Sequence, residues 1–147
     1  MLNIVATTGG DANKVSVSST PKTVASIKPA SGRSLNVRSV HIGGVSATST
    51  DAPWLVEFIV ATTPGTFTSV TPVKRNTEDG DTVASSAGRN ASGEPGGTVT
   101  VIREERLPYP FSRTWQLDVK VKNGSEFGVR VTAPTSSNCN WTIEAVE

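Results

Sequence analysis

The chain has 147 residues, of which 14 are Lys or Arg and 13 are Asp or Glu, so its formal net charge is +1 at pH 7. This length suffices for one domain with its own hydrophobic core. Because the basic residues are scattered and only 5% of residues are aromatic, the sequence lacks the basic stripe of a nucleic-acid-binding surface and is poor in rings that stack on bases or sugars. We therefore expect no nucleic-acid partner.

The single cysteine, Cys139, excludes an intrachain disulfide and a cysteine-based zinc site. We expect it to be a small buried apolar residue. The N-terminal residues lack the basic region of a signal peptide, and no apolar run approaches the ~20 residues of a membrane helix. These features predict a protein that is made in a cytosol and has no membrane partner.

The chain is rich in strand signals and almost devoid of helical periodicity. Apolar residues alternate with polar ones in short runs that are bounded by Gly, Pro, Ser and Asn. Strands are predicted over residues 14–18, 22–28, 33–42, 54–61, 67–74, 98–103, 113–121, 126–132 and 139–146. This pattern predicts an all-β fold: a single-domain antiparallel β-sandwich, specifically a jelly roll of about eight strands.

Several local features predict how these strands are arranged. Residues 14–18 and 22–28 are expected to form a short pair, and Asn123-Gly124 is a strong hairpin signal between residues 113–121 and 126–132. Pro72 places its strand at an edge or a bulge. Trp115 and Trp141 fall on the inward faces of their strands.

Two segments do not fit a compact sandwich. Residues 1–13 are predicted to be an N-terminal extended arm that precedes the sandwich domain of residues 14–147; the arm is either unpacked or adds to a neighbour. Residues 76–97 are small and polar and are predicted to form a long loop, which is a candidate contact surface because structureless loops of this length are uncommon.

Residues 54–61 are apolar on both faces of the predicted strand except at Glu57. Such a strand is covered on both sides, by layers of its own fold or by a neighbouring subunit. Because an unpaired buried carboxylate is costly, we hypothesise that Glu57 pairs with an arginine of its own chain or of a neighbour. The alternative is a solvent-facing position on an edge strand.

The groups that enzymatic chemistry needs are sparse. The one histidine, His41, lies near a predicted strand end without a nucleophile motif around it, and Glu104-Glu105 is flanked by arginines, as in a solvated mixed-charge segment. Residues 76–81 carry several oxygen ligands but lack the spacing of a calcium-binding EF-hand loop. We therefore expect no enzyme, no cofactor and no metal.

Three stretches carry a resemblance to a known family: GTFTSVTPVK (residues 65–74), ASGEP (residues 91–95) and GVRVTAP (residues 128–134). They occur in that order, separated by a long variable loop, and the chain closes on a strand rich in Glu. In this arrangement the chain resembles the head decoration (cement) proteins of tailed bacteriophages, which are encoded beside the major capsid protein. The resemblance covers about half of the chain and does not extend to residues 1–32.

The resemblance implies a non-enzymatic virion protein that binds the outer surface of the major capsid protein lattice and stabilises the capsid. It also implies a homo-oligomer, with a trimer favoured, made in the host cytoplasm and located on the outer surface of the capsid. The candidate contacts with the capsid or between subunits are Leu2, Ile4, Val5, Trp54, Glu57, Asp79, Asp81, Arg89 and Glu94.

Two other functions are compatible with the sequence. The first is a receptor- or carbohydrate-binding β-sandwich of a phage fibre, for which Trp54 and Tyr109 would supply exposed rings. The second is another head or tail accessory protein, such as a head–tail completion protein, which would share the fold and the location in the virion.

Overall fold

The structure is a computed structural model that describes residues 1–46, 52–108 and 111–147. These residues form one short 3-10 helix, η1 (Asp11–Asn13), and twelve strands. The strands are β1 (Asn3–Thr7), β2 (Val15–Val17), β3 (Lys22–Lys28), β4 (Leu35–Ser46), β5 (Trp54–Thr63), β6 (Thr66–Val70), β7 (Val73–Lys74), β8 (Ser86–Gly93), β9 (Gly96–Leu107), β10 (Phe111–Val121), β11 (Glu126–Thr132) and β12 (Ser137–Val146). Among the described residues, no helix has the length and hydrophobicity needed to cross a membrane.

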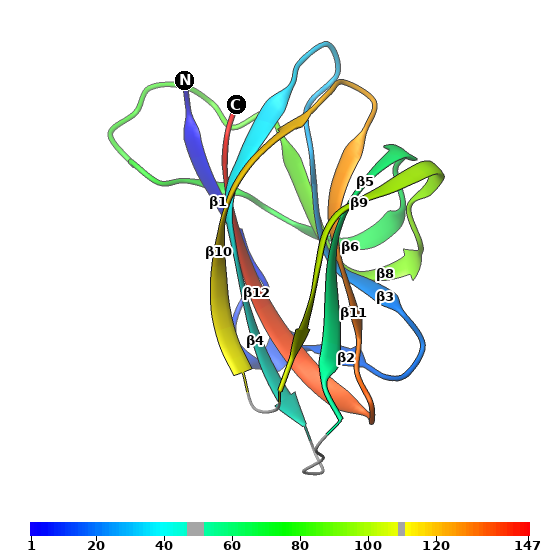
Figure 1. The fold of residues 1–147 in the computed structure, drawn as a ribbon. Helices are drawn as coiled ribbons and strands as arrows, with labels where there is room; N and C mark the ends of the chain where they lie inside the picture. Colours follow the sequence, from blue (N-terminus) through cyan, green and yellow to red (C-terminus); the bar gives the residue numbers. More distant parts are fainter. Residues whose placement is uncertain (47–51, 109–110) are drawn as a thin grey trace.

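The strands form two six-stranded antiparallel sheets that pack face to face (Figure 1). Sheet A has the order β10-β4-β12-β1-β7, with β2 also pairing with β12. Sheet B has the order β6-β8-β3-β11-β5-β9. The predicted antiparallel β-sandwich is therefore confirmed.

Eight of the strands have a jelly-roll arrangement. They form four antiparallel pairs, namely β1 with β12, β3 with β11, β4 with β10 and β5 with β9. Alternate pairs belong to different sheets, so the chain winds as a long double strand around one core, as a jelly roll does. The strands β2, β6, β7 and β8 are additions to this frame.

The core lies between the two sheets and is filled by large side chains from both. Trp54, Phe58 and Phe127 come from sheet B, and Trp115 and Trp141 come from sheet A. The inward positions predicted for the two sheet A tryptophans are thus confirmed. Cys139 is also in the core, as predicted, and burial raises the pKa of its thiol to about 12.

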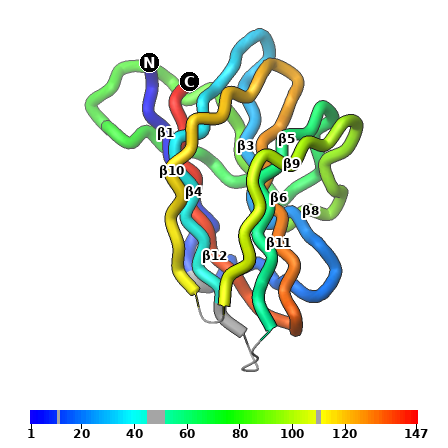
Figure 2. Tube along the Cα trace, in the orientation of Figure 1, coloured from blue at the N-terminus to red at the C-terminus, as the bar shows by residue number. Residues whose placement is uncertain are grey.

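The predicted N-terminal arm is not separate from the sandwich, which corrects the division at residue 13. Residues 3–7 form β1, which lies between β12 and β7 in sheet A, and Asn3 is opposite Val146. This pairing places the two chain ends side by side at one end of the sandwich (Figure 2). The strand forms because Ile4 and Ala6 bury their side chains while Val5 faces outward.

The predicted long loop over residues 76–97 is also corrected, because its second half contains β8. The irregular segment between β7 and β8 spans residues 75–85 and projects beside the chain ends (Figure 1). The Glu147 carboxylate accepts backbone N–H groups of Ala84 and Ser85, both at 2.8 Å. The C-terminal residue therefore fixes one end of this loop.

Two predicted strand pairs are wrong for one reason. The strands β2 and β3 belong to different sheets, as do β10 and β11. Gly124 has a positive φ of 83°, as expected of a tight turn, but this turn carries the chain from one sheet to the other. In a jelly roll most consecutive strands change sheets, so a turn signal does not imply a hairpin.

The prediction for Pro72 is confirmed. The predicted strand over residues 67–74 is divided at Thr71-Pro72 into β6, at an edge of sheet B, and β7, at an edge of sheet A. Proline lacks the N–H that a central strand must donate, so the chain crosses between the sheets there.

Candidate functional site

Three of the residues predicted as contacts are core residues. Leu2 is 4% exposed, Ile4 1% and Trp54 0%. They therefore cannot present a surface to a capsid or to another subunit, and the prediction is corrected at these positions. The cause is the integration of β1 into sheet A and the inward orientation of Trp54, whose ring packs edge-on against Phe111 at a centroid distance of 5.2 Å.

The other predicted contact residues differ in how accessible they are. Asp81 and Glu94 are exposed, whereas Val5, Asp79 and Arg89 are half-buried. Arg89 donates from Nη1 to the backbone carbonyl of Thr8 at 2.9 Å, so it connects the sheets at one margin. Tyr109, predicted as a ring for ligand binding, lies outside the described residues.

Glu57 pairs with an arginine of its own chain, as hypothesised. Arg130 donates from Nε to Oε1 at 3.1 Å and from Nη2 to Oε2 at 2.9 Å, which is a bidentate contact. The two residues are directly opposite each other on β5 and β11. The hydrogen bonds with Glu57 raise the pKa of the Arg130 guanidinium above its ordinary value. The pair is therefore a cross-strand clamp between two central strands of sheet B.

The variant Arg130→Ala is expected to lower the free energy of unfolding by about 1–3 kcal/mol. The Glu57 side chain is only 12% exposed, so its carboxylate would lose its partner where water compensates poorly. A matched control is Arg38→Ala, which breaks an ion pair with Asp118 whose side chains are 47% and 74% exposed. That change should cost less than about 1 kcal/mol. If urea-induced unfolding shows equal losses of unfolding free energy for the two variants, the Glu57–Arg130 pair is not the more stabilising of the two ion pairs.

Residues 54–61 are covered on both faces by the chain itself. Trp54, Val56 and Phe58 belong to the core, whereas Ile59 and Ala61, on the outer face of sheet B, are 1% and 0% exposed. The side chain of Ile59 lies over Gly128, where a Cβ atom would be 3.2 Å from it. The apolar outer positions therefore need no second subunit to bury them.

A pocket of about 310 Å³ lies on the outer face of sheet B. Its walls include Glu126, Lys28 and Phe67, and its remaining lining consists mostly of glycine and small side chains: Ser26, Gly65, Thr66, Ser69, Ser86, Ala87 and Gly88. A Cβ atom at position 88 would collide with the Phe67 side chain, and one at position 65 would approach Phe67 Cε2 to 2.9 Å. Glycines at these two positions thus make room for the ring.

Glu126 is a buried carboxyl group in this pocket. It is 2% exposed and accepts the Gly65 N–H at 2.9 Å. Burial raises the pKa of Glu126, and the Gly65 N–H, the charge of Lys28 and a hydrogen bond from Ser26 oppose that rise. Glu126 lies on the opposite face of β11 from the core residues Phe127 and Val129, where the turn between β5 and β6 covers it. The only signal of this cover in the sequence is the pair Gly65 and Gly88.

The variant Glu126→Gln is expected to be more stable than the parent protein at pH 7.5, with the difference vanishing toward pH 4. Because the pKa of Glu126 is raised in the folded state, the unfolded chain ionises at lower pH than the folded one. Stability is therefore lost as the pH rises through the unfolded pKa toward the folded pKa. Thermal unfolding at both pH values measures this, and a stability difference that grows in acid would contradict the expectation.

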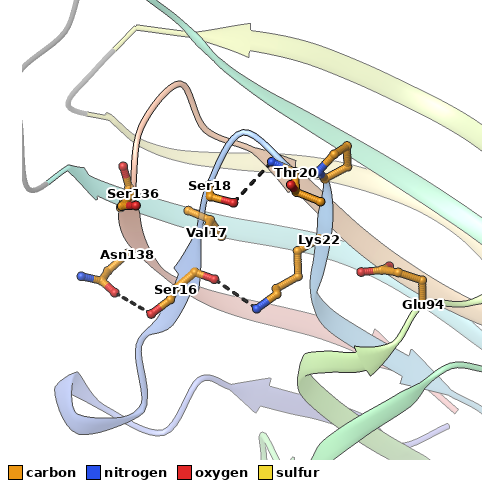
Figure 3. A pocket seen from close by; sticks show the side chains of 10 residues that line it. Ser16, Val17, Ser18, Thr20, Lys22, Glu94, Ser136 and Asn138 are labelled. Atoms are coloured by element: carbon orange, nitrogen blue, oxygen red, sulfur yellow. Dashed lines mark hydrogen bonds between the residues drawn. The ribbon is translucent and has the colours of Figure 1, made fainter.

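A larger pocket of about 640 Å³ lies beside the turn between β2 and β3 (Figure 3). Turns and strand ends form its walls, among them Ser18, Thr20 and Ser136. Lys22 donates to Asn90 Oδ1 at 3.0 Å, and the Glu94 carboxylate accepts the backbone N–H of Thr23 at 2.8 Å. These two charged groups face a rim of hydroxyls, but none of the lining residues is aromatic.

The residues considered for catalysis have structural partners. His41 Nδ1 lies 2.9 Å from Thr114 Oγ1 and Nε2 lies 3.3 Å from Ser112 Oγ. His41 is on the outer face of sheet A, whereas the cysteine, Cys139, faces the core and is not a nucleophile beside it. The prediction that Glu105 belongs to a solvated segment is wrong. Its carboxylate accepts the Trp115 indole N–H at 2.7 Å and pairs with Arg113.

In the loop between β7 and β8, polar side chains accept hydrogen bonds from backbone N–H groups of the loop itself. Asn76 Oδ1 accepts the N–H of Glu78 at 3.1 Å, and Asp79 Oδ1 accepts that of Asp81 at 3.0 Å. Within the described residues, no group of three or more His, Cys, Asp or Glu side chains is placed to hold a metal ion.

The edge strand β9 is the most apolar exposed feature of the described surface. Three of the five large apolar side chains exposed in the described residues lie on it: Val99 at 36%, Val101 at 42% and Ile102 at 40%. The strand is twelve residues long and pairs with β5 on one side. In the described part of the chain no strand pairs with its other side. Sequence alternation identified this strand but not its position at an edge.

In comparisons with known proteins, no protein-family model, curated protein or solved structure matches the chain.

Proposed function

We propose that this protein is a non-enzymatic structural component of a virion that decorates a tailed-phage capsid by binding the outer surface of the major capsid protein lattice. The observation that carries the proposal is the β9 edge. A long strand edge with exposed valines is a surface for adding another protein, because its unpaired backbone groups and apolar side chains both gain from a partner. The choice of capsid protein as the partner comes from the resemblance of residues 65–74, 91–95 and 128–134.

The fold is compatible with this role by analogy. Jelly rolls occur in viral capsid proteins, although they also occur in lectins, so the fold alone does not decide the function. The two edge strands on one side of the sandwich are tied together, since Glu105 of β9 contacts Trp115 and Arg113 of β10. A docking edge that is held in this way loses little freedom on binding, which favours affinity.

We further propose that the protein binds as a symmetric homo-oligomer, with a trimer favoured. A trimer would present three equivalent β9 edges to a repeating lattice. Each contact can then be weak, because the first contact raises the effective concentration of the other two.

The test is a solution mass determination followed by cosedimentation with phage heads that lack the protein. The expected result is a trimer that pellets with the heads at saturating stoichiometry. The variant Val101→Lys should fold and stay in the supernatant, because a lysine on an exposed edge opposes strand addition. Thr114→Lys, an exposed position on β10, is the matched control and should still pellet.

A parent protein that stays in the supernatant at high concentration would overturn the proposed function. If the Val101→Lys and Thr114→Lys variants pellet equally, the protein still binds the capsid, but β9 is not the surface that binds.

A further inference from the structure

The Glu126 pocket has the composition of a binding site, and its lining comes from β3, β6, β8, β11 and the turn between β5 and β6, with no residue of β9. We propose that it binds a single neutral hexose or N-acetylhexosamine unit. This inference goes beyond capsid decoration and does not depend on it.

The walls of the pocket combine opposite charges with hydroxyl groups. The Glu126 carboxyl group and the Lys28 ammonium are close enough to interact electrostatically, so the site has a balanced charge. A phosphate or sulfate needs an excess of positive charge or a cluster of backbone N–H groups, and an amine needs an excess of negative charge. Hydroxyl groups can both donate and accept hydrogen bonds, so a ligand rich in hydroxyls suits an acceptor, a donor and serine side chains together.

Phe67 supplies the apolar side of the site. Its ring lies against Gly88 and Gly65 and is half-buried, so part of it remains accessible. Sugars have apolar C–H faces beside their hydroxyl edges, and rings of this kind commonly lie against them in small-ligand sites with few polar groups. The sequence pointed to Trp54 and Tyr109 as rings for a glycan, but Trp54 is fully buried.

The size of the pocket limits the ligand. A volume of about 310 Å³ is at the lower end of the roughly 300–1,000 Å³ typical of ligand pockets, which suits one sugar ring. The larger pocket beside the β2–β3 turn is less suitable, since its lining residues include no aromatic ring and its Glu94 side chain is exposed. In the Glu126 pocket, by contrast, the acidic group is buried.

The experiment is an NMR titration of the full chain with methyl α-glucoside, methyl α-galactoside and methyl β-N-acetylglucosaminide. At least one should shift the amide signals of Ser26, Gly65 and Gly88. For a ligand of this size a dissociation constant of about 1 mM is expected. Glucosamine and glucuronate, the charged probes, should bind more weakly than their neutral counterparts.

Variants test whether the named residues hold the sugar. Glu126→Gln and Phe67→Leu should each weaken binding by about tenfold. Lys22→Met, in the larger pocket, and Thr114→Ala, on sheet A, should leave the dissociation constant unchanged. Folded spectra of Glu126→Gln and Phe67→Leu would show that their weaker binding is not a loss of structure.

The source of the sugar is tested with an oligosaccharide that ends in the unit that binds best. Equal or tighter binding of the oligosaccharide assigns the site to the end of a surface glycan, and binding of the methyl glycoside alone assigns it to a free sugar. The proposal is overturned if no neutral sugar shifts these signals at 50-fold above the expected constant, or if Glu126→Gln and Phe67→Leu both bind with the dissociation constant of the parent protein. It is also overturned if a charged probe binds most tightly.

Discussion

Deletion of residues 1–8 is expected to abolish the cooperative folded state. The segment carries all of β1, which pairs with β12 through residues 3–7 and with β7 on its other side. The deletion also removes the buried side chains of Leu2, Ile4 and Ala6. Burial of one Leu or Ile contributes about 1.5–3 kcal/mol, and the stability of a whole domain is only about 5–15 kcal/mol. Losing the strand therefore removes a large part of the total.

A second loss comes from Thr8, which is 2% exposed. Its hydroxyl group accepts the backbone N–H of Trp141 at 2.6 Å and donates to the carbonyl of Trp141 at 3.1 Å. Deletion would leave both backbone groups without these partners next to the core, at about 1–3 kcal/mol for each unsatisfied group. The truncated chain should therefore lack the sharp thermal transition of the parent protein.

Circular dichroism during heating measures this prediction. The matched control is the double variant Asn3→Ala and Thr7→Ala, which changes the two exposed side chains of β1 and keeps the strand; it should melt close to the parent protein. A truncated chain that melts cooperatively near the parent temperature would restore the free-arm interpretation. Particle binding by the truncated chain is informative only in that case.

The sequence predicted the faces of the strands better than their partners. Alternation placed Trp115 and Trp141 inward because each strand has one face toward the core, and that pattern is local. The choice of sheet is not local. The strands on either side of Asn123-Gly124 belong to different sheets, because β10 pairs with β4 whereas β11 pairs with β3 and β5. These partner strands are distant in the chain.

The strand β8 shows what alternation misses. Its sequence, SAGRNASG, is small and polar, and its glycines and Asn90, which has a positive φ of 52°, are unfavourable for an isolated strand. It forms because β3 and β6 pair with it on both sides. The same kind of tertiary cover hides Glu126. The pocket could not be predicted from the sequence, since a segment remote from β11 forms its cover.

The variant Phe58→Ala is expected to lower the free energy of unfolding by about 3–5 kcal/mol, through lost burial and the cavity that remains. Phe58 is 2% exposed, and its ring packs edge-on against Trp115 at 5.1 Å and beside Phe127 at 6.0 Å. It therefore joins both sheets. For a chain of this size each kcal/mol shifts the melting temperature by roughly 2–4 °C, so a fall on the order of 10 °C should be seen.

The matched control is Phe67→Ala, which removes the same ring from the half-buried outer face of sheet B. It should cost less, at about 2 kcal/mol or below, and equal costs would contradict the placement of the core. Phe58 also supports the β9 edge, because β9 pairs only with β5 among the described strands. In Phe58→Ala the amides of β9 should therefore exchange with solvent faster than those of β12, whose neighbours β1 and β4 support it on both sides.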